Sequence, residues 1–147
     1  FGLTPKHTLA HIYRSVMEST GYAFKQVLSI IEEKGIKVNK ISIVDGGAKS
    51  ELWRQILADI LGIPITYIEG NVGAPLGNAV LAGLGIGIFK NERIVKEWIK
   101  ETTIHNPTQR NREVYDHYYK IYLELYELLK SIFKNYLSID NLNKRCI

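Results

Sequence analysis

The sequence predicts an α/β fold in which helices flank a mainly parallel sheet. Helical patterns alternate with short β-branched runs in the order helix, strand, helix, strand, helix, and this order is typical of a parallel sheet. A long amphipathic pattern then closes the chain. The 147 residues, 46% of them hydrophobic and 23% charged, have the composition of a globular protein with room for a core. We therefore expect a single domain over residues 1–147.

The first helix is predicted to begin near Pro5 and Thr8 and to end before Gly35. Gly21 interrupts its apolar pattern, which indicates either a close packing contact or a break into two helices. The apolar residues at helical spacing are Leu9, Ile12, Val16, Ala23, Val27, Leu28 and Ile31.

The run KISIV, residues 40–44, predicts a short buried strand because it is β-branched and apolar. Two glycines follow its carboxyl end. Ser50 is then a plausible N-cap for a second helix, whose apolar side extends to Leu61. Gly62 ends this helix, and Pro64 blocks its continuation.

The run ITYIE, residues 65–69, predicts a second strand, and a loop with a small-residue helix follows over 70–89. A short helix over 92–100 and a polar loop over 102–111 come next. The last helix is expected from about residue 113 to about residue 136. Small residues would let the helix within 70–89 approach its neighbours closely; they are Gly77, Ala79, Ala82, Gly83 and Gly87.

The stretch IVDGGAKSELW, residues 43–53, is the candidate binding site. Ligands of open α/β sheets bind at the carboxyl ends of strands. Gly46 and Gly47 remove side chains where a flat or anionic ligand could lie on the backbone. Ser50 and the first-turn N–H groups after it would be donors, with the positive end of the helix behind them. The same glycines could instead serve a tight turn that requires a positive φ. The local pattern leaves both interpretations open.

Two familiar nucleotide motifs are excluded by their spacing. A P-loop requires glycine directly before the lysine of GxxxxGK[ST], whereas Ala48 precedes Lys49. The dinucleotide fingerprint GxGxxG should follow a strand and open a helix, whereas residues 83–87 read GxGxG late in an apolar run. This argues against an NAD-dependent oxidoreductase domain.

No metal site and no catalytic residue are predicted within the chain. His7 and His11 stand four apart, as two ligands on one helix face would, but Thr8 replaces the glutamate of HExxH and no third ligand is nearby. No GxSxG occurs, and the single cysteine, Cys146, lies next to the C-terminus. Asp45 is the one acid beside the glycines, so no pair of carboxylates is available for acid–base work.

Charge and hydropathy argue against nucleic-acid and membrane partners. The net charge is +4, and the 19 basic and 15 acidic residues are interspersed without a Lys/Arg block. The longest apolar stretch, 79–89, is too short to span a bilayer, and no signal peptide is recognisable. One cysteine allows no internal disulfide, which favours a cytoplasmic setting. The first residue is not methionine, as expected of a processed product or a piece of a longer protein.

The last predicted helix carries five tyrosines at helical spacing. Such residues, with hydroxyls at the edge of a core, are typical of a packed terminal helix, and they are also compatible with a partner surface or a base-stacking platform. They are Tyr115, Tyr118, Tyr119, Tyr122 and Tyr126.

Two segments together resemble the C-terminal domain of FGGY carbohydrate kinases, which include xylulose, glycerol, gluconate and ribulose kinases. They are VDGGAKSELWRQILADILGIPI, residues 44–65, and GAPLGNAVLAGLGIGIF, residues 73–89. The segment TLAHIYRSVMESTGYAFKQVL, residues 8–28, is similar to the helix that precedes the family's adenosine motif. The segment EVYDHYYKIYLELYELLKSIF, residues 113–133, is similar to its closing helix, so the resemblance covers nearly the whole chain.

The resemblance implies an actin-like, ribonuclease H-like ATPase lobe with a long C-terminal helix. In such kinases ATP, with Mg²⁺, lies between two lobes and gives its γ-phosphate to a sugar or polyol hydroxyl. The sugar and the catalytic aspartate belong mainly to the N-terminal lobe, which this chain lacks, so the chain alone is expected to be inactive. Asp45 takes the place of the first of three glycines found in many members, as it does in glycerol-kinase-like sequences.

The resemblance also implies which residues bind ATP or ADP. The family's glycine turn matches Gly46, Gly47 and Ala48, and by position Lys49 and Ser50 would line the same pocket. The alternative is a non-enzymatic actin-like lobe that binds a partner through its tyrosine-rich helix. Apolar surface exposed where the first lobe should dock would also make a homodimer plausible.

Overall fold

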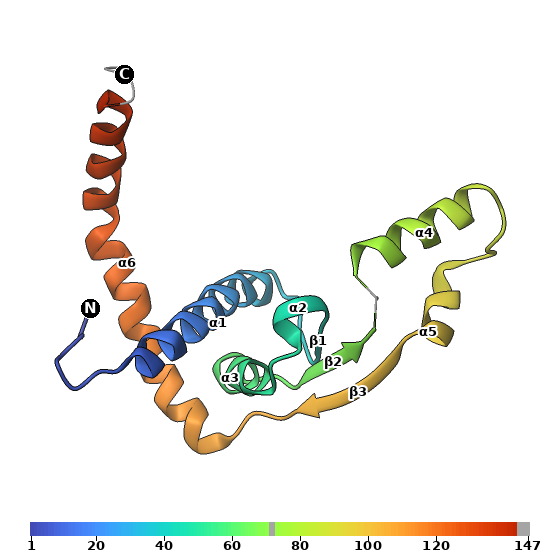
Figure 1. Ribbon diagram of the computed structural model, residues 1–147, viewed down its shortest axis with the longest axis horizontal. Coiled ribbons are helices and arrows are strands. Elements are labelled where there is room, and N and C mark those ends of the chain that lie inside the picture. The colour runs from blue at the N-terminus through green and yellow to red at the C-terminus, as the bar shows by residue number, and fades with distance from the viewer. Residues whose placement is uncertain (71–72, 144–147) are drawn as a thin grey trace. The chain divides into compact units, whose positions relative to one another are not determined.

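The computed structural model of the chain describes residues 1–70 and 73–143, and it has the α/β architecture that the sequence predicts (Figure 1). Contacts group the chain into two compact units, Phe1–Arg112 and a second that begins at Glu113. The elements are α1 (Leu9–Glu33), β1 (Ile41–Ile43), α2 (Asp45–Ala48), α3 (Glu51–Leu61), β2 (Ile65–Glu69), α4 (Ala74–Gly85), the 3-10 helix η1 (Glu92–Ile94), α5 (Val95–Trp98), β3 (Lys100–His105) and α6 (Gln109–Asn143).

The described strands form one sheet in the order β1-β2-β3. β1 and β2 are parallel, with Ile41 opposite Ile65, because α3 connects them as a crossover. β3 runs antiparallel to β2, with His105 opposite Ile65, and the register shifts between Tyr67 and Ile68. The polar segment 102–111 was expected to be a loop, and this expectation is wrong for its first four residues. They pair with β2 as an edge strand.

The first helix is continuous over its 25 residues, so Gly21 marks a packing contact and not a break. A Cβ atom at Gly21 would lie 2.6 Å from Cδ1 of Ile60, a fully buried residue of α3. Glycine therefore lets the backbones of α1 and α3 approach each other closely.

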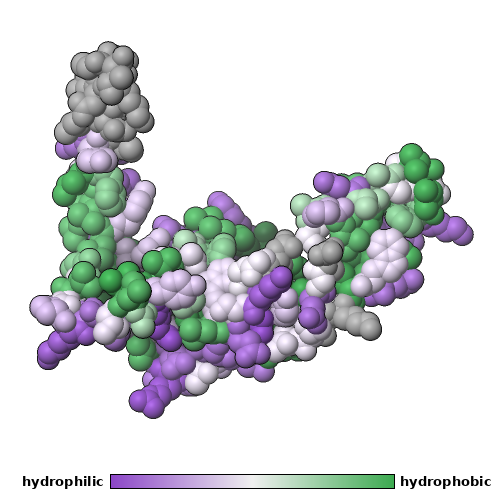
Figure 2. Space-filling view, viewed as in Figure 1, coloured by the Kyte–Doolittle hydropathy of each residue, from purple (hydrophilic) through white to green (hydrophobic). Residues whose placement is uncertain are grey.

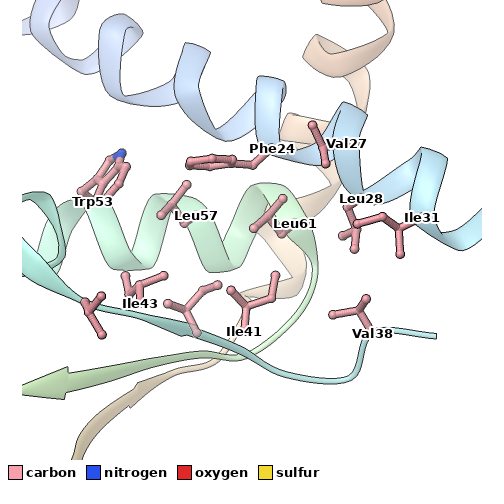
Figure 3. Close-up of a pocket in the computed structure, with 12 residues that line it drawn as sticks. Phe24, Val27, Leu28, Ile31, Val38, Ile41, Ile43, Trp53, Leu57 and Leu61 are labelled. Carbon is pink, nitrogen blue, oxygen red and sulfur yellow. The ribbon is translucent and has the colours of Figure 1, made fainter. Parts of the chain in front are cut away.

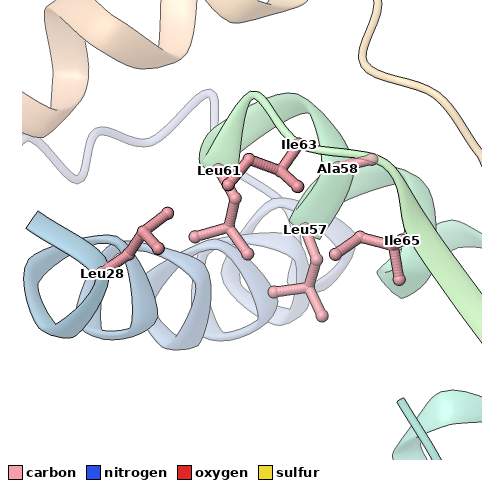
Figure 4. Packing of buried hydrophobic residues seen from close by; sticks show 6 residues of the cluster. All are labelled: Leu28, Leu57, Ala58, Leu61, Ile63 and Ile65. Carbon is pink, nitrogen blue, oxygen red and sulfur yellow. The ribbon is translucent and has the colours of Figure 1, made fainter. Parts of the chain in front are cut away.

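The second helix, α3, forms the centre of the core. The side chain of Ser50 accepts a hydrogen bond from the Trp53 amide at 3.3 Å, and Gly62 ends the helix with a left-handed φ of 69°, as predicted. Figure 4 shows how the core joins α1, α3 and the chain leading into β2. Its buried members are Leu28, Leu57, Ala58, Leu61, Ile63 and Ile65.

The first strand is not buried as predicted. Ile41 and Ile43 are half-buried and Ser42 is exposed, because β1 forms one side of an open groove. Figure 3 shows this apolar groove between α1, α3 and β1, with a volume of about 420 Å³. Among the described residues, no strand pairs with the outer edge of β1.

The small-residue helix, α4, is apolar on several sides, and Figure 2 shows hydrophobic surface over α4 and the turn after it. The predicted close approach holds at Gly83, whose Cβ position is occupied by the ring of Phe89. Gly77 has open space instead, and Leu81 and Ile86 are exposed. In the described part of the chain, no helix is both long and apolar enough to cross a membrane.

The last helix begins four residues earlier than expected, at Gln109. Its first turn is fixed by Asp59 of α3, a carboxylate that is 2% exposed. Oδ1 of Asp59 accepts the Thr108 amide at 2.7 Å, and Oδ2 accepts Nδ2 of Asn111 at 2.8 Å. An acidic group at this place neutralises the positive end of the helix and satisfies a free N–H group.

Candidate functional site

The two glycines after β1 lie in the single-turn helix α2. Neither Gly46 nor Gly47 has a positive φ, unlike Gly62 and Gly70. The interpretation that these glycines serve a left-handed turn is therefore wrong.

Packing explains why glycine is required at position 47. A Cβ atom at Gly47 would lie 3.0 Å from the ring of Trp53, which is tighter than an ordinary contact. At Gly46, by contrast, a Cβ atom would meet nothing within 4 Å. Neither conformation nor packing within the described structure requires glycine at position 46, so its bare backbone is open to a ligand.

A polar cavity of about 620 Å³ lies beside Gly46. Four elements form it: α2 with the residue after it, the first turn of α3, the carboxyl end of β2 and the facing part of β3. This size suits a nucleoside-sized ligand, and the end of a parallel strand is where open α/β sheets bind ligands. The lining residues are Gly46, Lys49, Glu51, Arg54, Tyr67, Glu69, Gly70, Thr102 and Thr103.

Arg54 is the most buried side chain that lines the cavity, with 3% of it exposed. Its Nη1 donates to the Ala48 carbonyl at 2.6 Å, and its guanidinium carbon lies 4.6 Å from the ring centroid of Tyr67. Its Nη2 is 3.7 Å from Oε1 of Glu51. Nε has no hydrogen-bond partner among the described residues. Burial of this charge is offset by the carbonyl, the ring and the carboxylate together.

The charges around the cavity nearly balance. Lys49 and Arg54 are opposed by Glu51 and Glu69, and the two threonines add hydroxyl groups. A cluster of phosphates would meet these carboxylates, whereas a neutral aromatic base or a ribose with polar edges would find donors and acceptors. The cavity is therefore suited to the uncharged part of a nucleotide.

His105 of β3 is half-buried and interacts electrostatically with two residues that line the cavity, Arg54 and Glu51. Burial lowers the pKa of its imidazole from the ordinary 6.5, the positive charge of Arg54 lowers it further, and Glu51 acts weakly in the opposite direction. The imidazole is consequently neutral near pH 7, and it does not add a positive charge beside the guanidinium.

Two of the five predicted site residues, Gly46 and Lys49, line the cavity. The other three support it from behind. Gly47 packs against an indole, Ala48 is buried and offers its carbonyl to the guanidinium, and Ser50 caps α3. The structure thus separates a cavity-lining part of the motif from a supporting part.

Four further lining residues, Arg54, Tyr67, Thr102 and Thr103, were not predicted from the sequence. Tyr67 could have been predicted, because it lies near the carboxyl end of the second predicted strand. The carboxyl end of the first predicted strand had indicated the glycines for the same reason. No signal existed for the threonines, since the strand that carries them was not predicted. Arg54 was not recognised because it lies within a helix that otherwise has an amphipathic pattern.

The two histidines of α1 are engaged locally. Nδ1 of His7 bonds to Thr4 at 2.9 Å, and Nδ1 of His11 accepts the Thr8 amide at 3.1 Å. Among the described residues, no group of three His, Cys, Asp or Glu side chains could hold a metal ion. Cys146 lies outside the described residues, and so does the side chain of Asp45.

Similarity to known proteins indicates the family of the chain. Residues 1–86 match the model of the FGGY family of carbohydrate kinases, C-terminal domain. The chain is 33% identical over 141 residues to a xylulose kinase of Staphylococcus epidermidis, covering 95% of this chain and 28% of that protein. It therefore spans less than a third of the length of this relative.

Solved structures agree on the fold. The crystal structure of xylulose kinase from Rhodospirillum rubrum superposes with a TM-score of 0.79 at 28% identity, covering 91% of this chain and 28% of that one. The structure of Plasmodium falciparum glycerol kinase with ADP superposes with a TM-score of 0.68 at 21% identity, covering 84% of this chain and 26% of that one. The fold of the chain is accordingly that of the actin-like kinases.

Proposed function

The chain belongs to the FGGY family of carbohydrate kinases as its C-terminal domain, and we propose that it forms the nucleotide-binding lobe of an ATP-dependent sugar or polyol kinase. One observation carries this proposal. Gly46 opens onto the polar cavity although neither packing nor φ requires glycine there. A base or ribose lying on that backbone is the simplest reason for leaving the position bare. The solved glycerol kinase that shares the fold was crystallised with ADP, which supports the same assignment.

Within this site each residue has a different task. Gly46 supplies bare backbone for the flat part of the nucleotide, and Lys49, which is exposed at the rim, supplies a positive charge on the side from which phosphates would extend. Ala48 and Ser50 act indirectly by fixing the turn to α3. The exposed carboxylates of Glu51 and Glu69 would repel phosphates from the cavity itself.

The chemical step is assigned to the rest of the kinase. In FGGY kinases the catalytic aspartate belongs mainly to the N-terminal lobe, and residues 1–86 of this chain match the C-terminal domain. A base on the other lobe would take the proton while the hydroxyl oxygen attacks the γ-phosphorus of ATP and ADP leaves. Xylulose and glycerol are the acceptors suggested by the relatives' names.

The apolar groove shown in Figure 3 is the proposed contact with the remainder of the kinase. Phe24, Val27 and Trp53 leave apolar surface open there, next to the outer edge of β1. We take residues 1–147 as one C-terminal lobe, whose isolated form would associate with itself through this surface. The cytoplasm is the proposed location.

Nucleotide titration tests the proposal. ADP should bind the purified chain more tightly than NAD does, as followed by isothermal titration calorimetry. The chain should not turn over xylulose or glycerol in the presence of ATP and Mg²⁺. A folded chain that binds neither nucleotide would contradict the binding assignment, and phosphorylation of either acceptor would contradict the assignment of the base to another lobe.

The alternative function is a partner-binding lobe without catalysis. It is favoured by the exposed apolar side chains of α6, among them Tyr118, Tyr126 and Leu128, the last of which is 73% exposed. Under this alternative, ADP would not bind, and substitution of these residues by serine would abolish association with a partner while the free energy of unfolding stays unchanged.

A further inference from the structure

We infer that Arg54 is a positioning residue that holds the glycine turn in its ligand-binding conformation; this inference rests on the proposed function. Consecutive residues of α3 contact the turn from two directions. The ring of Trp53 lies against Gly47, and the guanidinium of Arg54 is bonded to the carbonyl of Ala48. Two contacts thereby hold Gly47 and Ala48, directly after Gly46, whereas a Cβ atom at Gly46 itself would meet nothing within 4 Å.

Each of these two contacts is anchored to a different element. Nε1 of Trp53 donates to Oγ1 of Thr20 at 3.1 Å, which connects the indole to α1. Arg54 lies over the ring of Tyr67 at 4.6 Å, which connects the guanidinium to β2. The position of the turn is therefore fixed relative to both the first helix and the sheet.

Arginine suits this position better than lysine because its guanidinium is planar. One edge donates to the Ala48 carbonyl while the flat face remains on the aromatic ring, and an ammonium group cannot do both at once. The hydrogen bond at 2.6 Å is short and is made by a group that is 3% exposed, so water does not compete for it.

Removal of the guanidinium should act on the turn first. Two backbone bonds close the turn, from the Lys49 amide to the Gly46 carbonyl at 3.3 Å and from the Ser50 amide to the Gly47 carbonyl at 3.1 Å. Without Arg54, the Ala48 carbonyl between them loses its buried donor, and these two amides should open more often.

The experiment combines amide hydrogen exchange with ADP titration of the full chain. In Arg54→Met, we expect exchange at the Lys49 and Ser50 amides to accelerate at least tenfold relative to the central amides of α3, and ADP affinity to fall at least tenfold. Arg54→Lys retains the charge and should show the same pattern. It replaces Arg54→Met in the experiment if the methionine variant does not fold.

Two controls separate positioning from general stability. Arg93→Met makes the same change at an exposed arginine of η1 outside the cavity and should alter neither readout. Ile60→Val weakens the core of α3 and should accelerate exchange generally while ADP affinity stays constant. Arg54 would be a packing residue only, and the inference wrong, if its variants accelerate all amides equally and leave ADP affinity unchanged.

The exchange measurement also distinguishes this inference from the proposed function. If the natural chain does not bind ADP, the proposed function fails. In that case, selective acceleration at the two turn amides would still support Arg54 as the residue that holds the turn, and uniform acceleration would overturn it.

Discussion

Trp53 packs its indole directly on the backbone of Gly47, so that a Cβ atom at Gly47 would lie 3.0 Å from Cζ3 of the ring. Two further ring atoms would lie 3.4 and 3.5 Å away. The indole cannot retreat freely, because its N–H group is bonded to Thr20. Glycine at position 47 therefore serves packing, whereas a Cβ atom at position 46 would meet open space beside the polar cavity.

This relationship predicts that Gly47→Ala lowers the free energy of unfolding by about 1–3 kcal/mol, because the ring must move. Urea unfolding measures the change. In a Trp53→Leu background the same substitution should cost less than about 0.5 kcal/mol, since the obstructing ring is gone. An equal cost in both backgrounds would show that the indole does not restrict position 47.

A second prediction concerns the contact between α1 and α3. Gly21→Ala should destabilise the chain by about 1–3 kcal/mol, despite the higher helix propensity of alanine, because the new methyl group would overlap Cδ1 of Ile60. Ile60→Val lacks that atom and should remove most of the penalty when the two changes are combined. As a matched control, Gly77→Ala in α4 has open space and should stabilise by up to about 1 kcal/mol.

A third prediction concerns the carboxylate that fixes the start of α6. Asp59→Ala should lower the free energy of unfolding by about 3 kcal/mol, because bonds to a charged group contribute about 1.5–3 kcal/mol each and are not additive. The donors left behind include the Thr108 amide and Nε2 of Gln55, both bonded to Oδ1. Asn111→Ala removes one of the bonds and should cost about 1 kcal/mol. Equal losses in the two variants would contradict the network.

Much of the fold could be predicted from local sequence signals. The cap at Ser50 and the stop at Gly62 are both found where capping chemistry placed them, since these effects involve only near neighbours in the chain. The order of the helices and the parallel pairing of the first two strands were also predicted from local sequence patterns. The edge strand β3 was not predicted because its residues are mostly polar, and its structure depends on pairing with β2, more than 30 residues earlier.

The candidate site was predicted in part. The local pattern indicated Gly46 and the family resemblance added Lys49, and both line the cavity. The local pattern did not distinguish Gly46, which lines the cavity, from Gly47, which packs against the indole, because that difference depends on where Trp53 places its ring. Arg54 and Tyr67 meet across a helix and a strand, and such pairs have no fixed spacing in a sequence.

A fourth prediction follows from the lowered pKa of His105. Because the folded state holds this imidazole neutral while the unfolded chain titrates near 6.5, stability is fully present above pH 6.5 and decreases as the pH falls through the lower pKa of the folded state. In His105→Gln the loss of unfolding free energy between pH 7.5 and 5.0 should be smaller than in the natural chain. Urea unfolding at the two pH values measures it, and identical losses would contradict burial beside Arg54.

The central claim is that the bare backbone of Gly46 seats a nucleotide, and calorimetric titration with ADP of Gly46→Leu tests it most directly. A Cβ atom at position 46 would meet nothing within 4 Å, so we expect the free energy of unfolding to stay within about 0.5 kcal/mol of the natural value. Gly77→Leu, also placed in open space but outside the cavity, is the matched control. We predict that ADP affinity falls at least tenfold in Gly46→Leu and is unchanged in Gly77→Leu. A folded Gly46→Leu chain that binds ADP as tightly as the natural one would contradict the account.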